Sequence, residues 1–448
     1  EGFMYSILLL ILSIIMLMVL ISKMRLHAFL SLLIVSLLLG LASGMPLTQV
    51  TDTVAAGFGG TMQSIGIVIV CGVVVGEILE CTGAAQKIAD SILRLVGIKR
   101  APLATAVTGG VVSIPTFCDS GFVILNPVIK ALSRKGNIPY MVLVTSLMCG
   151  LLTTHSLVPP TPGPIAVAGI LGADVGKVMV YGLIIAVPVI LITQLWCNSK
   201  FIKNRYPEIA EADEKDIAAN DKFAEIVAHS PNTFMSYMPI IVPIILIVVR
   251  SFFTQYYTDT ESMLYQVIGF IGTPYVALLI GTLLSFLLPA KLTSEVTDNW
   301  VSTAIQKSAE ILLITGIAGC YGKVLQAIGV GDVLAGVIAG MGIPSVVLPF
   351  VISAIVLMAQ GSATVAMTTT AGIILPLLPA LAISPELATI AIAGGSFCGV
   401  LPMGSYFWCV TKLSGFDIKR GYVAVTATTY IMGVSALAAI LVMSMVVH

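Results

Sequence analysis

The sequence predicts an all-α polytopic membrane protein made of two inverted-topology repeats, each carrying a re-entrant hairpin and a proline-broken helix. Three observations support this prediction. Hydrophobic residues make up 58% of the chain and charged residues 10%, with a mean hydropathy of +1.05, whereas soluble domains carry about 25% charged residues. Apolar runs long enough to cross a bilayer recur along the 448 residues. Some of these runs contain proline- and glycine-rich interruptions at related places in the two halves.

The apolar runs define ten candidate spans. The first lacks a basic leading region and a small-residue cleavage site, so we expect a retained helix rather than a signal peptide. Two further apolar regions, about 102–132 and about 344–381, are broken in the middle, and each is long enough for two half-helices that enter and leave on one side. The candidate spans are residues 5–21, 27–43, 61–79, 140–152 with a broken continuation, 175–196, 234–253, 264–288, 310–326, 385–412 with a second break, and 421–447.

The basic residues indicate an orientation. With both termini outside and both hairpins re-entrant, about 19 of the 22 Lys and Arg residues fall in cytoplasmic loops, as the positive-inside rule requires. This distribution supports the orientation of the spans. It does not show that the hairpins are re-entrant, which is inferred from the breaks in their sequence.

The chain divides into an N-terminal repeat (1–197), a polar cytoplasmic linker (198–232) and a C-terminal repeat (233–448). The glycine spacing of Gly76 to Gly83 recurs from Gly322 to Gly329, and in both halves a short helical stretch, a hairpin and a proline-broken helix are expected to follow. The acidic cluster in the linker is more typical of a solvated segment than of a partner site. Two repeats of opposite orientation indicate a secondary transporter with its site near the midplane.

The first hairpin tip contains Asp119, Ser120 and Gly121. A carboxylate in apolar sequence costs about 2.5–3.5 kcal/mol to insert, so we expect it to face a partner or a water-filled site. The alternative is a structural carboxylate at a half-helix N-terminus.

The second tip contains Gln360, Gly361, Ser362 and Thr364. Half-helix N-termini present unpaired amides that suit an anion, and small residues let the backbone approach a ligand. The alternative is close helix packing through small residues.

The first proline break lies between His155 and Pro164, and His155, Thr161 and Gly163 are its candidate site residues. His155 is a candidate proton relay or hydrogen-bond donor, although a lone histidine is as often structural. The second break, 399–405, contributes Gly404 and Ser405. Together the four interruptions predict a polar cavity at the midplane.

Other features of the sequence have structural interpretations. Glu77 and Lys323 occupy matching repeat positions and either form an ion pair or lie at helix ends near water. The eight cysteines are scattered, without metal-ligand spacing, and are expected to be small core residues. No motif of soluble enzymes, cofactor binding or nucleic-acid binding is present in the sequence, so we expect no enzyme activity, cofactor or nucleic-acid partner.

The sequence from His155 to Ala166 resembles the signature of the gluconate permease family, the gluconate:proton symporters, whose members usually read His-x-x-x-Pro-Pro-His-Pro-Gly-Pro. The tip from Phe117 to Phe122 resembles the family's Phe-Phe-Glu-Val-Gly-Phe, and Ala359 to Ala366 resembles its second-hairpin motif. The likeness covers essentially the whole chain, with the three motifs in matching order.

This resemblance implies a proton-coupled symporter of the bacterial inner membrane that imports gluconate or a related sugar acid. It also implies a homodimer in which a transport domain moves against a scaffold domain, as in an elevator. By position, Asp119 replaces the family's hairpin glutamate and His155 keeps its histidine, which makes both candidates for proton coupling. The expected partners are a small organic anion, protons and membrane lipid.

Two departures bear on the substrate. Thr161 stands where many members have histidine, and Asp119-Ser120 replaces Glu-Val. A D-serine or other small hydroxy- or amino-acid symporter therefore remains an alternative, as does sodium coupling through tip carbonyls and hydroxyls. An anion channel is the alternative from a different class, although paired inverted hairpins favour alternating access.

Overall fold

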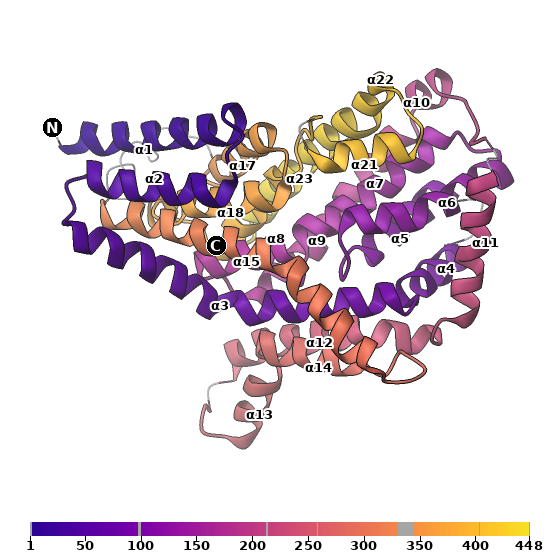
Figure 1. Ribbon diagram of the computed structural model, residues 1–448, viewed down its shortest axis with the longest axis horizontal. Coiled ribbons are helices and arrows are strands. Elements are labelled where there is room, and N and C mark those ends of the chain that lie inside the picture. The colour runs from indigo at the N-terminus through magenta and orange to yellow at the C-terminus, as the bar shows by residue number, and fades with distance from the viewer. Residues whose placement is uncertain are drawn as a thin grey trace.

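The computed structural model describes residues 2–96, 100–211, 214–257, 259–329, 344–402 and 404–447. Every regular element in these ranges is a helix, which confirms the predicted all-α class. Six of the helices are long and apolar enough to cross a membrane, or up to seven if one bent pair counts as a span. Figure 1 shows them in an elongated bundle in which segments from both halves of the chain lie together.

The N-terminal half contains the long helix α3, a hairpin of α5 and α6, and the interrupted pair α7 and α8. The long helix α9 follows the interrupted pair. The elements are α1 (Gly2–Met18), the π-helical turn η1 (Val19–Lys23), α2 (Ala28–Ala42), α3 (Leu47–Cys81), α4 (Ala84–Val96), α5 (Ala101–Val112), α6 (Cys118–Gly136), α7 (Tyr140–Leu157), α8 (Pro162–Leu171) and α9 (Val175–Cys197).

The linker and the C-terminal half are also helical in the described residues. The short helical stretch expected after Gly329 lies outside the described residues. The elements are α10 (Lys200–Arg205), α11 (Glu214–His229), α12 (Thr233–Tyr256), α13 (Met263–Ile271), α14 (Pro274–Ser285), η3 (Glu295–Trp300), α15 (Val301–Ala327), α17 (Val347–Gln360), α18 (Ala363–Ile374), α19 (Leu378–Leu381), α20 (Pro385–Gly395), α21 (Ser405–Leu413), α22 (Ile418–Gly421), η4 (Tyr422–Ala427) and α23 (Thr428–Ser444).

The two long helices α3 and α15 pack against each other through glycines. A Cβ built at Gly57 would lie 2.7 Å from the Cα of Cys320, and one built at Gly319 would lie 2.0 Å from Oγ1 of Thr61. Small residues are a common device for close helix packing in membranes, where burial of apolar surface does not favour helix association. This contact joins the two halves of the chain.

Interrupted helix pairs lie at all four places where the sequence predicts a hairpin or a broken helix. The interruptions are residues 113–117 between α5 and α6, 158–161 between α7 and α8, 361–362 between α17 and α18, and 396–404 between α20 and α21; Met403 of the last one lies outside the described residues. Every residue of α7 is buried, so the helix before the first proline break lies in the centre of the protein.

The candidate span over residues 264–288 is not one straight helix. The chain instead forms α13 and α14, bent by 64° at residues 272–273. Pro274 favours the first position of a new helix. At Gly272 a Cβ would lie 2.3 Å from Cβ of Arg250, so the chain at the bend is closely packed against α12.

The linker between the halves is held in place at several points. The amide of Ala210 donates to Oγ of Ser133 at 3.1 Å, and the amide of Tyr140 donates to the carbonyl of Glu208 at 2.9 Å. The carboxylate of Glu208 also pairs with Arg420 at 2.7 Å. In Figure 1, α11 runs along the edge formed by the ends of α4 and α6, which it contacts. The linker is therefore partly helical and attached to both halves.

Candidate functional site

Each of the four interruptions is followed by a half-helix. These half-helices are α6, α8, α18 and α21. Proline causes the first break, because each proline removes a backbone donor and disfavours helix in the residue before it. In the second half, Gly361 and Gly399 have positive φ values of 76° and 84°, which glycine adopts without steric cost.

The tip of the first hairpin contacts the first broken helix. The rings of Phe117 and His155 lie 5.9 Å apart, and both residues line a small cavity together with Thr116 and Thr161. This cavity has a volume of about 10 Å³, which is room for about one water molecule. His155 and Thr161 are thus brought together, and both are buried.

Two glycines of α3 allow the first hairpin tip and the first proline break to approach this helix closely. A Cβ built at Gly76 would lie 2.2 Å from the carbonyl oxygen of Pro115, and one built at Gly72 would lie 3.1 Å from that of Pro160. The long helix therefore supports both the hairpin tip and the proline break. Gly76 belongs to the repeated glycine pattern of the sequence, and a Cβ built at its counterpart Gly322 would lie 3.0 Å from the carbonyl oxygen of Gly372 in α18.

The first broken helix in turn contacts the second hairpin. A Cβ built at Gly163 would lie 2.2 Å from Cε of Met367 and 4.0 Å from Oγ1 of Thr364. The absence of a side chain at Gly163 therefore lets α8 approach α18. This contact brings together candidate residues from the two halves of the chain.

The tip of the second hairpin contacts the second broken helix, where a Cβ built at Gly404 would lie 2.3 Å from the carbonyl oxygen of Gly361. Gln360 precedes this tip, and neither atom of its buried carboxamide group has a hydrogen-bond partner. Ser362 caps α18, since its Oγ accepts from the amide of Val365 at 3.5 Å.

The second broken helix contacts the first hairpin. Sγ of Cys409 in α21 lies 3.9 Å from the backbone oxygen of Asp119, in the first turn of α6. Oδ1 of Asp119 is buried without a hydrogen-bond partner, and so is the hydroxyl of Tyr406. Each interruption or its following half-helix therefore contacts the next, and the four form a closed ring.

The ring contains polar groups that native proteins rarely leave unpaired. Nδ1 of His155 is buried without a partner, as are the Asp119, Gln360 and Tyr406 atoms above. Such groups usually bind water, an ion or a ligand. The N-termini of four half-helices also lie at the ring, and α6, α8 and α21 have no side-chain cap. Uncapped amides and the partial positive charge of a helix N-terminus attract anions.

The other candidate residues have mixed environments. The hydroxyl of Thr161 donates to the carbonyl of Val158 at 2.7 Å and so stabilises its own loop. Gly121 faces Leu151, Ser120 is half-buried, and Ser405 is exposed at the start of α21. Sequence reasoning missed Tyr406, although it directly follows the predicted break at Ser405. Among the described residues, no group of three His, Cys, Asp or Glu side chains is arranged to hold a metal ion.

Glu77 and Lys323 do not form the ion pair considered from their matching positions. Glu77 is buried and pairs with Lys307, near the start of α15, whereas Lys323, near the end of α15, is exposed. This ion pair joins α3 to α15, outside the ring. It is therefore part of the contact between the two long helices.

A multi-pass helical membrane protein with this arrangement has the fold of known transporters. The chain covers 89% of the YdaH transporter of Alcanivorax borkumensis with a TM-score of 0.63 at 16% identity, and 89% of the chain is matched. It also matches MtrF of Neisseria gonorrhoeae, described with a class of antimetabolite efflux pumps, with a TM-score of 0.66 at 14% identity over 90% of this chain and 85% of that one.

The chain belongs to the GntP permease family, whose model matches residues 5–446. It is 35% identical to an uncharacterized permease of Haemophilus influenzae over 96% of this chain and 91% of the relative. It is 30% identical to the gluconate permease of Bacillus subtilis over 97% and 98%, and 29% identical to the gluconate permease of Pseudomonas aeruginosa over 97% and 96%. The predicted family is therefore confirmed, and with it a membrane transport protein.

Proposed function

We propose that this permease is a proton-coupled symporter that brings a small hydroxylated carboxylate, gluconate or a related sugar acid, into the cell. The observation that supports it best is the closed ring of four interruptions, with four half-helix N-termini and unpaired polar groups. The substrate carboxylate binds against the backbone amides of these N-termini. Relatives named as gluconate permeases favour the same substrate class.

The substrate hydroxyls bind the polar side chains and exposed backbone of the ring. A polyhydroxylated acid needs both donors and acceptors, and the unpaired carboxamide of Gln360 supplies both. The remaining members of the proposed substrate site are Asp119, Ser120, Gly121, His155, Thr161, Gly163, Gly361, Ser362, Thr364, Gly404, Ser405 and the additional residue Tyr406.

Proton coupling is assigned to Asp119 and His155. Each has a buried side-chain atom without a hydrogen-bond partner, and the two residues belong to neighbouring parts of the ring. Protonation of Asp119 removes a negative charge from a site that receives an anion, so proton and substrate binding favour each other. D-serine or another small hydroxy or amino acid, and sodium coupling, are the competing assignments.

The contacts between the halves support two inverted repeats and alternating access. The second half of hairpin 1, α6, contacts α21 of the second broken helix, and the second half of hairpin 2, α18, contacts α8 of the first. Contacts in which the hairpin of each half packs on the broken helix of the other half are expected of two repeats related by a pseudo-twofold axis. We assign residues 1–197 and 233–448 to the repeats, 198–232 to the linker, and the hairpins and broken helices to a transport domain that moves like an elevator against the remaining scaffold. The protein is assigned to the bacterial inner membrane as a homodimer with both termini outside.

The experiment reconstitutes the purified protein in liposomes and measures uptake of labelled gluconate. An inward proton gradient is expected to drive accumulation above equilibrium. Accumulation that ignores pH and follows a sodium gradient contradicts proton coupling, and a conductance far above carrier turnover favours an anion channel. A panel of sugar acids, hydroxy acids and D-amino acids, tested by thermal shift, identifies the substrate, because a selective ligand raises the stability of the folded protein.

Asp119→Asn separates coupling from binding in the same liposomes. This variant is expected to lose uphill uptake while keeping part of its counterflow exchange, since exchange needs no net proton movement. Gly59→Ala, in an open part of α3, is the matched control. Uphill uptake at the wild-type level in Asp119→Asn removes Asp119 from the coupling mechanism.

A further inference from the structure

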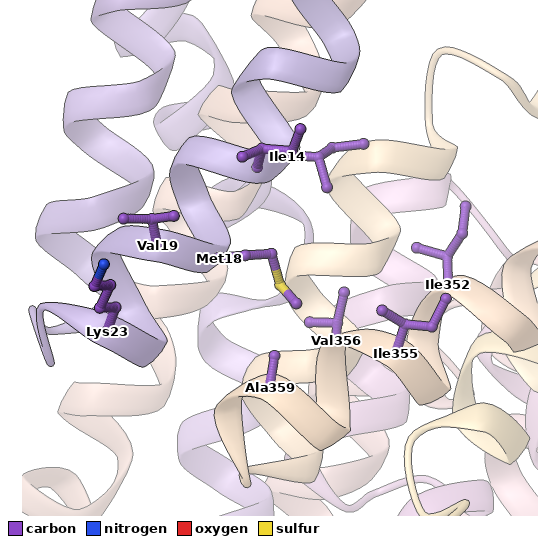
Figure 2. A pocket seen from close by; sticks show the side chains of 9 residues that line it. Ile14, Met18, Val19, Lys23, Ile352, Ile355, Val356 and Ala359 are labelled. Carbon is purple, nitrogen blue, oxygen red and sulfur yellow. The ribbon is translucent and has the colours of Figure 1, made fainter.

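A second cavity lies apart from the ring, between the N-terminal helix α1 with its extension η1 and the first half of hairpin 2, α17. Its volume is about 570 Å³, within the range of cavities that hold small ligands. Figure 2 shows α1 and η1 on one side and α17 on the other. Aliphatic and Met side chains line it from both helices: Ile14, Met18 and Val19 from one, and Ile352, Ile355 and Val356 from the other.

The cavity is open along its length. Ile15 and Ile355 at its margins are each about half exposed, at 53% and 52%. In a membrane-embedded bundle, an open groove with an aliphatic lining faces hydrocarbon. The ligand class that fits such a lining is an acyl chain.

One end of the groove carries a positive charge. Lys23, the last residue of η1, lines the cavity and is exposed. The amide of Met24 donates to the carbonyl of Val19, five residues earlier, so η1 has the wide π-type turn. Such a turn brings residues five apart nearer to one face, which places Lys23 on the same side as Met18. Within the described part of the chain, no carboxylate lies within 4 Å of its ammonium group.

We propose that this groove binds an anionic phospholipid, with one acyl chain along α17 and the headgroup phosphate on Lys23. Basic residues at the end of an intramembrane groove are suited to anionic headgroups. A phospholipid supplies both the apolar chain and the negative charge, whereas a second protein copy would have to place an acidic side chain beside Lys23. The bound lipid contacts the half-helix that ends at Gln360 and so borders the second hairpin tip.

This assignment is independent of which substrate the ring binds, and its test measures lipid rather than transport. The purified full-length protein is delipidated in detergent and incubated with phosphatidylglycerol or phosphatidylcholine of identical acyl chains. Native mass spectrometry then counts the lipid retained per chain. The wild type is expected to retain phosphatidylglycerol in preference to phosphatidylcholine.

Two variants divide the site into its parts. Lys23→Gln is expected to weaken phosphatidylglycerol retention about fivefold, as for the loss of one basic contact, and to leave phosphatidylcholine retention unchanged. Ile355→Trp fills the groove and is expected to lower retention of both lipids. Because Ile355 is half exposed, the variant is expected to fold, which an unchanged melting temperature verifies.

Matched controls address basic charge and groove volume separately. Lys291→Gln removes an exposed basic residue elsewhere. Ile184→Trp alters a groove of about 530 Å³ between α9 and α23, whose lining contains no Lys or Arg. Both controls are expected to keep the preference for phosphatidylglycerol. Equal phosphatidylglycerol retention by Lys23→Gln and the wild type overturns the proposal, and so does an Ile355→Trp variant that shifts dimer to monomer with unchanged lipid.

Discussion

The carbonyl oxygen of Gly361 lies 2.3 Å from the position that a Cβ at residue 404 would take. The tip of the second hairpin and the second broken helix thus meet backbone to backbone, and only glycine at 404 permits it. Real Cβ contacts are never this short, so any side chain at 404 forces one of the two interruptions to move.

Gly404→Ala is therefore expected to separate hairpin 2 from the second broken helix. The shift is expected to cost about 1–3 kcal/mol of folding stability, as for other overpacked sites, and to abolish most substrate uptake. Thermal unfolding in detergent and uptake in liposomes measure the two effects. Gly59→Ala, which meets nothing within 4 Å, is expected to keep full activity. A fully active Gly404→Ala protein would show that this contact is not needed.

Gly163→Ala tests the neighbouring contact, where the obstacle is a flexible side chain. The new methyl group would lie 2.2 Å from Cε of Met367, which can rotate away, so the loss is expected to be about 1 kcal/mol. Met367→Leu lacks the Cε atom and is expected to restore stability and uptake in the double variant. If the two changes are additive, α8 and α18 are not coupled through this pair.

Lys307→Met leaves the buried carboxylate of Glu77 without its ionic partner. Loss of one member of a fully buried pair costs about 3–5 kcal/mol, and because the Lys307 side chain is 42% exposed we expect about 1–3 kcal/mol. The double variant Glu77→Gln/Lys307→Met is expected to recover most of this loss, since no unpaired charge remains. Thermal unfolding measures this loss of stability, and Lys323→Met is the control. An unchanged melting temperature of Lys307→Met would mean that the ion pair contributes nothing to stability.

Tyr406→Phe removes a buried hydroxyl that has no hydrogen-bond partner. Folding stability is expected to stay the same or to rise, because an unsatisfied polar group is lost. If this hydroxyl binds the substrate, its loss raises KM about 10- to 100-fold, as for one hydrogen bond to a charged group. Uptake kinetics and thermal unfolding together distinguish a substrate-binding hydroxyl from a structural one. A large fall in stability with an unchanged KM would indicate a structural hydroxyl.

Local chemistry made the helix class and the interruptions predictable. Four prolines between His155 and Pro164 cannot continue a helix, and Gly361 stands in the middle of an apolar run, so both positions could be identified without a structure. The bend at Gly272-Thr273-Pro274 carried similar signals, but the apolar run was long enough to suggest one span. Length and hydropathy alone do not distinguish a straight helix from a bent pair.

The partners of individual residues were less predictable, because they depend on how the helices cross. Matching repeat positions left open whether Glu77 pairs with Lys323 or lies at a helix end, and the crossing of α3 and α15 brings Lys307 to Glu77 instead. Tyr406 was missed for the same reason. In the sequence, an aromatic residue one position beyond a break is typical of an apolar helix, and only the packing of α21 on α6 places its hydroxyl near Asp119.

The attachment of the linker has a consequence for the order in which the chain assembles. The acceptor for the first amide of α7 is the carbonyl of Glu208, and the hydroxyl of Ser133 accepts from Ala210, 77 residues further along the chain. The ribosome must therefore complete α7, α8, α9 and α10 before the turn between α6 and α7 receives these bonds. During synthesis, α7, which carries His155, is therefore inserted before the amide of Tyr140 at its N-terminus has this acceptor. The polar segment that contains Glu208 supplies the acceptor only after α8, α9 and α10 have been made.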